Sequence, residues 1–315
     1  MKLSLVIPCY NEEANIQPML DACVTALEGH LSSYELIFVN DGSRDGTWKT
    51  LKELCKQAPC PMKAINFSRN FGKDAAIYAG LQQAAGEYVT VIDGDLQQPP
   101  ETVLEMVALL DAQPHLDCVA AYQESRKETR FIAFCKKRFY RLMDKACAIE
   151  FHEGASDFRT FRRGMVEAIL SLREYDRFSK GIFSWVGFNT AYIPYTARPR
   201  HAGDTSWSFF KLVRYAIKGI VSFTTFPLKL ATVIGAITAL LSLLYMVFVV
   251  VQKLAFGIAV PGYPTIIVLI LLIGGIQMLM LGLLGEYIAR VFIQGKHRPL
   301  YITKETLCND DDALD

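Results

Sequence analysis

The chain has 315 residues, of which 51% are hydrophobic, and its mean hydropathy of +0.21 is high for a protein that is soluble throughout. Its 33 Lys and Arg residues are balanced by 32 Asp and Glu residues, which disfavours binding to nucleic acid, and the hydrophobic content excludes a disordered chain. Residues 230–285 contain one charge, Lys253, whereas residues 1–228 are rich in charge, so the composition excludes a polytopic transporter and indicates a soluble domain joined to a membrane anchor.

The N-terminal part alternates short β-branched runs with helical patterns. Strands are expected at 3–7, 35–39, 63–67 and 88–92, and helices at 14–27, 47–57, 73–84 and after Pro100. This βαβα order predicts an α/β domain, with a mostly parallel sheet and helices on both of its faces.

The first residues, MKLSLVIPCYNEE, do not have the pattern of a signal peptide, because a run of only five residues precedes Pro8 and acidic residues follow. The eight cysteines form no CxxC pair and have no histidine at metal-ligand spacing. We therefore expect the domain to stay in the reducing cytoplasm, with structural cysteines.

Polar clusters follow each of the first four predicted strands. They are Pro8 to Glu12, Asn40 to Ser43, Ser68 to Asn70 and Asp93 to Asp95. Each cluster alone could be turn chemistry, since turns use Asn, Asp, Gly and Ser. In sheets of this class, ligands bind beyond the carboxyl ends of the strands, so four clusters in register indicate a binding site there.

Asp93, Gly94 and Asp95 place two carboxylates at one strand end, and a turn at Gly94 would let both converge on one ligand. Two oxygen donors without a nearby His or Cys favour Mg²⁺ or Mn²⁺ bound together with substrate phosphates. A plain turn or cap is the alternative. The chain has neither a GxxxxGK[ST] loop nor a GxGxxG motif, so metal and cationic side chains would neutralise the phosphates.

Residues 126–141, RKETRFIAFCKKRFYR, alternate basic and aromatic side chains. In isolation this stretch could bind nucleic acid, anionic lipid or nothing. Beside a membrane anchor, lipid phosphate is the more economical interpretation.

Two apolar runs, 230–251 and about 264–286, are long enough to cross about 30 Å of hydrocarbon as helices. Two buried core helices are the alternative. Lys and Arg residues flank the outer ends of both runs, so the positive-inside rule predicts a multi-pass protein of the inner membrane with both termini in the cytoplasm. The residues before the first run, 206–228, have the pattern of a helix at the membrane interface. Glycines in the second run would allow a homo-oligomer.

The expected organisation is a cytoplasmic domain (1–205), a juxtamembrane amphipathic segment (206–228), two transmembrane helices (229–290) and a cytoplasmic tail (291–315).

Six motifs then make a resemblance specific: VIPCYNEE, VNDGSRDGT, FSRNFGKDAA, VIDGDLQQPPE, GASDFR and RHAGDTSW. In this order, and followed by two membrane helices, they resemble the bacterial polyprenyl-phosphate glycosyltransferases of glycosyltransferase family 2, which are related to dolichyl-phosphate mannose synthase. The resemblance extends from Lys2 to about Tyr301 and implies the GT-A fold. The combination of motifs, hairpin and tail looks most like the bactoprenol glucosyltransferases.

The resemblance implies roles for residues of the strand-end clusters. Asp95 and Gln97 match the metal ligands, which makes Asp95 a candidate catalytic residue. The positions that match the nucleotide-sugar site are Pro8, Tyr10, Glu12, Asp41, Lys73 and Asp93. Position 74 departs from the family, because Asp74 stands where the family has Glu. Without the resemblance, Lys73 would be an ordinary surface lysine.

The acceptor side is also implied by the resemblance. The residues that match the acceptor-phosphate site are Arg126, Arg130, Arg138, Arg200 and Ser206. Asp157 matches the aspartate of the D-F-R motif and is expected to be a catalytic base or an orienting residue. The alternative is a buried aspartate paired with Arg159 or Arg162.

The expected reaction is an inverting, metal-dependent transfer of a sugar, glucose from UDP-glucose as first choice, to polyprenyl phosphate at the cytoplasmic membrane face, for modification of cell-envelope glycans such as O-antigen. Formamido-arabinose, mannose, N-acetylhexosamine or a non-lipid acceptor remain alternatives. A processive polysaccharide synthase fits less well, since the chain lacks Gln-x-x-Arg-Trp. An inactive nucleotide-sugar sensor or membrane scaffold is disfavoured by the intact candidate residues.

Overall fold

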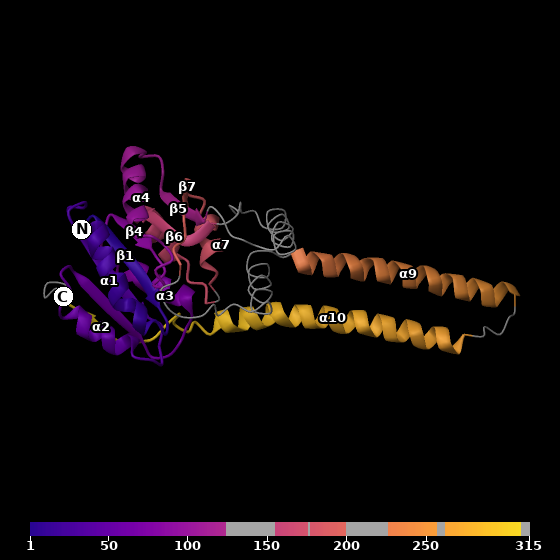
Figure 1. The fold of residues 1–315 in the computed structure, drawn as a ribbon. Coiled ribbons are helices and arrows are strands. Elements are labelled where there is room, and N and C mark those ends of the chain that lie inside the picture. Colours follow the sequence, from indigo (N-terminus) through magenta and orange to yellow (C-terminus); the bar gives the residue numbers. More distant parts are fainter. Residues whose placement is uncertain (124–154, 176, 200–225, 257–261, 310–315) are drawn as a thin grey trace. The chain divides into compact units, whose positions relative to one another are not determined.

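The structure is a computed structural model that describes the chain outside residues 124–154, 176, 200–225, 257–261 and 310–315 (Figure 1). The chain divides into two compact units. The first comprises Met1–Tyr215 and Arg298–Asp315, and the second comprises Ala216–His297. Residues distant in sequence thus share the first unit.

The first unit contains a mixed sheet of eight strands. They are β1 (Leu3–Cys9), β2 (Tyr34–Asn40), β3 (Met62–Phe67), β4 (Tyr88–Val91), β5 (Cys118–Gln123), β6 (Ala155–Arg162), β7 (Thr190–Tyr195) and β8 (Thr303–Cys308), in the order β7-β5-β6-β4-β1-β2-β3-β8. β1 pairs in parallel with β2 and β4, β2 with β3, and β5 with β7. β6 is antiparallel to β4 and β5, and β8 is antiparallel to β3. The predicted mostly parallel sheet is confirmed.

Helices cover both faces of this sheet, as predicted. The described helices of the unit are α1 (Glu13–Leu27), α2 (Thr47–Cys55), α3 (Lys73–Gln83), α4 (Glu101–Ala112), α6 (Arg163–Ser171) and α7 (Ser179–Trp185). Apolar residues of α1, α2 and α4 share one core with Leu5 and Ile7 of β1. α3 packs against the other face, where Val6 fills the space above Gly80, because successive strand residues point to opposite faces.

A buried carboxylate ties the strands together at the end opposite their carboxyl termini. Glu35 of β2 is 2% exposed. It accepts hydrogen bonds from the Ser4 hydroxyl (2.6 Å) and the Ala85 amide (2.8 Å), and it pairs with the Lys63 ammonium at 3.1 Å. The Ser4 oxygen in turn accepts the Gly86 amide at 2.7 Å. One side chain therefore links β1, β2, β3 and the turn before β4.

The C-terminal segment differs from its expected role as a tail. Thr303–Cys308 forms β8, which pairs with β3 and completes one edge of the sheet. The Trp48 indole donates a hydrogen bond to Glu305 at 3.0 Å, across 257 residues of sequence, and Tyr301 stacks on Phe67 with ring centroids 4.7 Å apart. The segment TKETLC lacks an apolar run, and its pairing partner is far away in sequence, so no local pattern indicates this strand.

The second unit contains two long helices side by side, α9 (Phe226–Phe256) and α10 (Tyr263–Gly295) (Figure 1). Both extend beyond the predicted spans. Their stretches Leu228–Gln252 and Leu272–Gly295 are long and apolar enough to cross a membrane, and neither is buried inside the protein. The large apolar surface that they expose argues against the alternative of two core helices.

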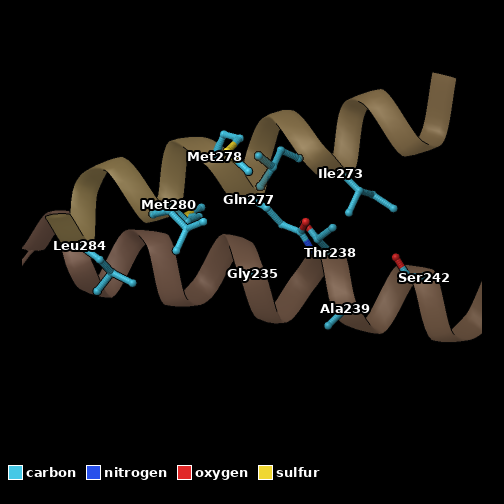
Figure 2. A pocket seen from close by; sticks show the side chains of 11 residues that line it. Gly235, Thr238, Ala239, Ser242, Ile273, Gln277, Met278, Met280 and Leu284 are labelled. Carbon is cyan, nitrogen blue, oxygen red and sulfur yellow. The ribbon is translucent and has the colours of Figure 1, made fainter. Parts of the chain in front are cut away.

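A groove of about 590 Å³ lies between α9 and α10. Figure 2 shows the Gln277 side chain of α10 pointing toward Thr238 of α9, with Ser242 further along the same groove. The Thr238 hydroxyl also donates to the Ile234 carbonyl at 2.9 Å. These three polar side chains of the hairpin thus line the groove between the helices, which lowers the cost of placing them in hydrocarbon.

Replacing Glu35 by alanine should lower the free energy of unfolding of the first unit by about 3 to 5 kcal/mol, because Lys63, Ser4 and the Ala85 amide lose a buried partner. Thermal unfolding of the detergent-purified protein measures this change. Glu53→Ala, at an exposed position of α2, is the matched control. Equal unfolding midpoints for the two variants would contradict the role of Glu35 in linking the strands.

Candidate active site

The candidate site is built on loops at the carboxyl ends of β1 and β2. The Asn11 amide donates to the Ser43 hydroxyl, and the Asn11 side-chain oxygen accepts the Arg44 amide, both at 2.9 Å. Gly42 has φ +60°, and a Cβ atom there would lie 2.3 Å from the Arg69 carbonyl carbon. Glycine is therefore required at this position, because backbone occupies the space that a side chain would need.

Asp41 holds the loop that precedes α3 in place through hydrogen bonds. Its carboxylate is buried and accepts hydrogen bonds from the Phe71 amide at 2.7 Å and the Gly72 amide at 2.9 Å. Burial raises the pKa of Asp41 to about 6, although the two amides and the charge of Arg69 act in the opposite direction. The carboxylate that was expected to contact a nucleotide is thus used to position the loop that leads to Lys73.

Lys73 is the first residue of α3 and connects two other predicted site residues. Its ammonium lies 2.6 Å from an Asp93 oxygen and 2.9 Å from an Asp157 oxygen. Asp93 follows β4, and Asp157 lies on β6, the neighbouring antiparallel strand. The structure therefore brings together a residue from each of three sequence motifs.

The charges of this triad determine its protonation. Burial alone would lower the pKa of Lys73, but the charges of Asp157 and Asp93 outweigh burial and raise it above the usual range. Burial alone would raise the pKa of Asp157, but the charges of Lys73, Lys180 and Arg159 hold it well below the usual range. Lys73 and Asp157 are consequently both ionised near neutral pH.

The alternative partners of Asp157 are engaged elsewhere. The Arg159 Nε donates to the Ser156 carbonyl at 3.0 Å. Arg162 donates to the carbonyls of Leu110 and Leu116 and to the Tyr88 hydroxyl. In the described part of the chain, Asp157 forms its ion pair with Lys73. Lys73 is therefore not an isolated surface lysine, because it pairs with two carboxylates.

The turn after β4 holds the candidate metal ligands. An Asp95 oxygen accepts the Gln97 amide at 3.2 Å, and Leu96 between them has φ +61°. The Gln97 carbonyl accepts the Arg198 amide at 2.9 Å. Gln98, to which the sequence motifs assign no role, is 5% exposed and holds Asp93 in place: its side-chain oxygen accepts the Asp93 amide at 2.8 Å.

These residues fit a divalent metal that arrives together with a phosphate ligand. Among the described residues, no group of three or more His, Cys, Asp or Glu side chains could hold a metal ion. The protein would supply the Asp95 carboxylate and the Gln97 amide oxygen, and phosphates and water would fill the remaining positions, as is usual for Mg²⁺.

The remaining residues that the resemblance assigns to the nucleotide-sugar site lie around the end of β1. Pro8 is within the strand, and Tyr10 is 42% exposed. The Glu12 carboxylate accepts a hydrogen bond from Asn15, and the Glu12 amide donates to the Thr47 hydroxyl at 3.0 Å.

The predicted acceptor-phosphate residues and most of the amphipathic segment lie outside the described residues. They are Arg126, Arg130, Arg138, Arg200, Ser206 and positions 206–225.

Comparison with known proteins identifies the family. Residues 4–170 match the family model "Glycosyl transferase family 2", and residues 226–291 match "GtrB C-terminal hairpin". A prophage bactoprenol glucosyl transferase homolog of Escherichia coli is 40% identical over 307 residues, covering 96% of this chain and 99% of that protein. A bactoprenol glucosyl transferase of Shigella phage SfV is 40% identical over 307 residues, covering 96% and 98%.

Among solved structures, a mannosyltransferase from Pyrobaculum calidifontis in complex with GDP-Man and Mn²⁺ is similar in fold. Its TM-score is 0.50 at 19% identity, covering 70% of this chain and 62% of the mannosyltransferase. The family match and the sheet confirm the expected GT-A fold. The chain belongs to glycosyl transferase family 2 and is a glycosyltransferase.

Replacing Lys73 by methionine should lower glycosyl transfer by about 100-fold or more, because two carboxylates would lose their shared cation in the candidate site. Lys73→Arg keeps the charge and should retain more activity. Initial rates of sugar transfer measure both variants, with exposed Lys56→Met as control. Activity of Lys73→Met within twofold of the unaltered protein would contradict a role for the triad.

The raised pKa of Asp41 predicts a pH dependence. Below pH of about 6 its carboxylate becomes protonated and accepts fewer hydrogen bonds from the Phe71 and Gly72 amides. The KM for the sugar donor should rise by about 10-fold between pH 7.5 and 5.5, because a backbone donor loses its partner. Asp41→Asn cannot titrate, so its KM should lack this rise. Identical pH profiles for both proteins would exclude Asp41 as the titrating group.

Proposed function

We propose that the enzyme transfers a sugar from a nucleotide sugar to polyprenyl phosphate at a membrane surface, with glucose from UDP-glucose as the first choice. The observation that carries the proposal is the Lys73 bridge between Asp93, on the expected donor side, and Asp157, on the expected acceptor side. Two observations support a lipid acceptor. The chain has an apolar hairpin that is long enough to cross a membrane, and similar proteins are named bactoprenol glucosyl transferases.

The nucleophile of this reaction is an oxygen of the acceptor phosphate, which attacks the anomeric carbon of the donor. Since the second pKa of a phosphate monoester is about 6, this oxygen is already largely charged at pH 7. Asp157, with its lowered pKa, would remove a proton poorly. We therefore assign Asp157 as an orienting residue that holds Lys73 in place.

The departing nucleoside diphosphate needs positive charge. The charge of Lys73 is already shared between Asp93 and Asp157, so further positive charge has to come from elsewhere. Asp95 and Gln97 would hold Mg²⁺ or Mn²⁺, and the ion, when bound, offsets the charge of the leaving group. Attack on the side opposite the leaving group inverts the anomeric centre, so an α-linked donor gives a β-linked lipid.

The connectivity of the chain supports the proposed membrane topology. The hairpin leaves the first unit after Tyr215, and the chain returns to that unit at Arg298 before forming β8. Both ends of the hairpin are therefore continuous with the catalytic unit and would lie on the same side of the membrane. The flanking Lys and Arg residues favour the cytoplasmic side. In α10, a Cβ atom at Gly274, Gly275 or Gly282 would meet no atom within 4 Å, which suits packing against a further copy.

The acceptor is tested with detergent-purified enzyme, radiolabelled nucleotide sugars and either polyprenyl phosphate or simple sugars. We expect label to enter the organic phase only with polyprenyl phosphate, and UDP-glucose to be the best of the UDP- and GDP-sugars. Transfer to simple sugars alone would favour a membrane-tethered enzyme with a soluble acceptor. Absence of transfer from every donor would favour a sensor or scaffold.

Replacing Asp95 by alanine should lower turnover by about 100-fold or more and weaken its dependence on added Mg²⁺ or Mn²⁺, because the carboxylate ligand is lost. Titration of turnover with each metal measures both effects. Glu105→Ala, at an exposed position of α4, is the control. A variant that retained full metal-dependent turnover would exclude Asp95 as a ligand.

A further inference from the structure

Lys180, which no motif of the sequence singled out, lies beside the Lys73 triad. It is the second residue of α7, and both ends of this helix contact neighbouring elements of the fold. The Ser179 amide donates a hydrogen bond to Asp74 at 2.9 Å, and Asp74 directly follows Lys73 in α3. At the other end of the helix, the Phe183 ring packs against Phe161 of β6, with centroids 5.0 Å apart.

These two attachments place Lys180 between the segments that carry Lys73 and Asp157. α7 contacts β6, beside which it lies in Figure 1, and the Arg159 guanidinium stands 5.3 Å from the Phe183 ring centroid. The position of Lys180 is therefore set by packing and by a backbone hydrogen bond.

The charge of Lys180 is not neutralised in the way that the charge of Lys73 is. Among the described residues, no carboxylate oxygen lies within 4.0 Å of the Lys180 ammonium, whereas Lys73 has two such partners. Burial lowers the pKa of Lys180, and the charges of Lys73 and Arg159 lower it further, while those of Asp157 and Asp93 raise it. A partly buried cation near other cations is costly unless an anion joins it.

We propose that Lys180 binds a phosphate oxygen of a substrate, and that Asp74 is a positioning residue that holds α7 so that Lys180 faces the Lys73 triad. This inference rests on the proposed function, in which both substrates carry phosphate. The phosphate belongs either to the nucleotide diphosphate of the donor or to the monoester of the lipid acceptor. Either assignment gives Asp74 a function, although it departs from the family's glutamate.

The primary test compares Lys180→Met with Lys180→Arg and with Lys49→Met, a control at an exposed position of α2. Two quantities are measured: the Kd for UDP in the presence of Mg²⁺, by calorimetry, and the KM for polyprenyl phosphate. We expect Lys180→Met to raise one of them by about 10- to 100-fold, because a charged hydrogen bond is lost. A higher Kd for UDP assigns Lys180 to the donor, and a higher KM for polyprenyl phosphate with unchanged UDP binding assigns it to the acceptor. Lys180→Arg should stay within about threefold of the unaltered protein.

The positioning role of Asp74 is tested by a conservative pair of variants. Asp74→Asn retains an oxygen that can accept the Ser179 amide and should behave like the unaltered protein, whereas Asp74→Ala should reproduce the Lys180→Met defect in part. Adding Asp74→Ala to Lys180→Met should worsen the affected constant no further, since Lys180 is already absent. If the effects of the two substitutions on the affected constant were fully additive, Asp74 would not act through Lys180.

The outcomes separate this inference from the proposed function. Values for Lys180→Met within twofold of the Lys49→Met control, in an enzyme that transfers sugar to polyprenyl phosphate, would overturn the inference alone. Equal losses in Lys180→Met and Lys180→Arg, with unchanged thermal unfolding, would also overturn it, because charge would then not be the property that matters. Absence of lipid glycosylation by the unaltered enzyme would instead overturn the proposed function.

Discussion

The arrangement of the site depends on one ammonium group shared between two carboxylates. Lys73 pairs with Asp93 at 2.6 Å and with Asp157 at 2.9 Å, and it thereby joins the start of α3 to the ends of β4 and the adjacent β6. Two carboxylates this close to one position would repel each other without the cation. The surroundings reinforce the arrangement, since Asp41 fixes the loop before Lys73 and Gln98 fixes Asp93.

This arrangement is suited to transfer between two anionic substrates. Such a reaction needs little help in generating the nucleophile, and its main electrostatic requirement is to hold two phosphates near each other while a diphosphate departs. Asp157, whose pKa is held well below its usual range, is better suited to be a fixed charge that positions Lys73 than to be a base. Under the proposed function, the apolar hairpin supplies the second constraint, because both of its ends are continuous with the catalytic unit and would tether that unit to the membrane that carries the lipid phosphate.

The sequence predicts the parts of this account that depend on local pattern. The strands and helices up to β4 follow from periodicity, and the strand-end clusters follow from the rule that ligands bind at the carboxyl ends of parallel strands. The pairing of Asp157 with Lys73 could not be predicted from the sequence. It depends on β6 lying next to β4, and the distance between two strands along the chain does not indicate whether they become neighbours in the sheet. The same holds for β8, whose sequence is polar, and for Lys180, a single lysine without a motif. The position of Gln98 has a recognisable context, directly after the Asp93 turn, but its buried amide is evident only in three dimensions.

The proposed function requires that the Lys73 triad serve an inverting transfer of sugar to a lipid phosphate. The anomeric configuration of the lipid made from UDP-glucose and polyprenyl phosphate, determined by proton NMR of the purified product, tests this requirement. We expect a β-linked polyprenyl-phosphate glucose. An α-linked product would contradict attack opposite the leaving group, and a product with glucose on anything other than the lipid phosphate would contradict the acceptor.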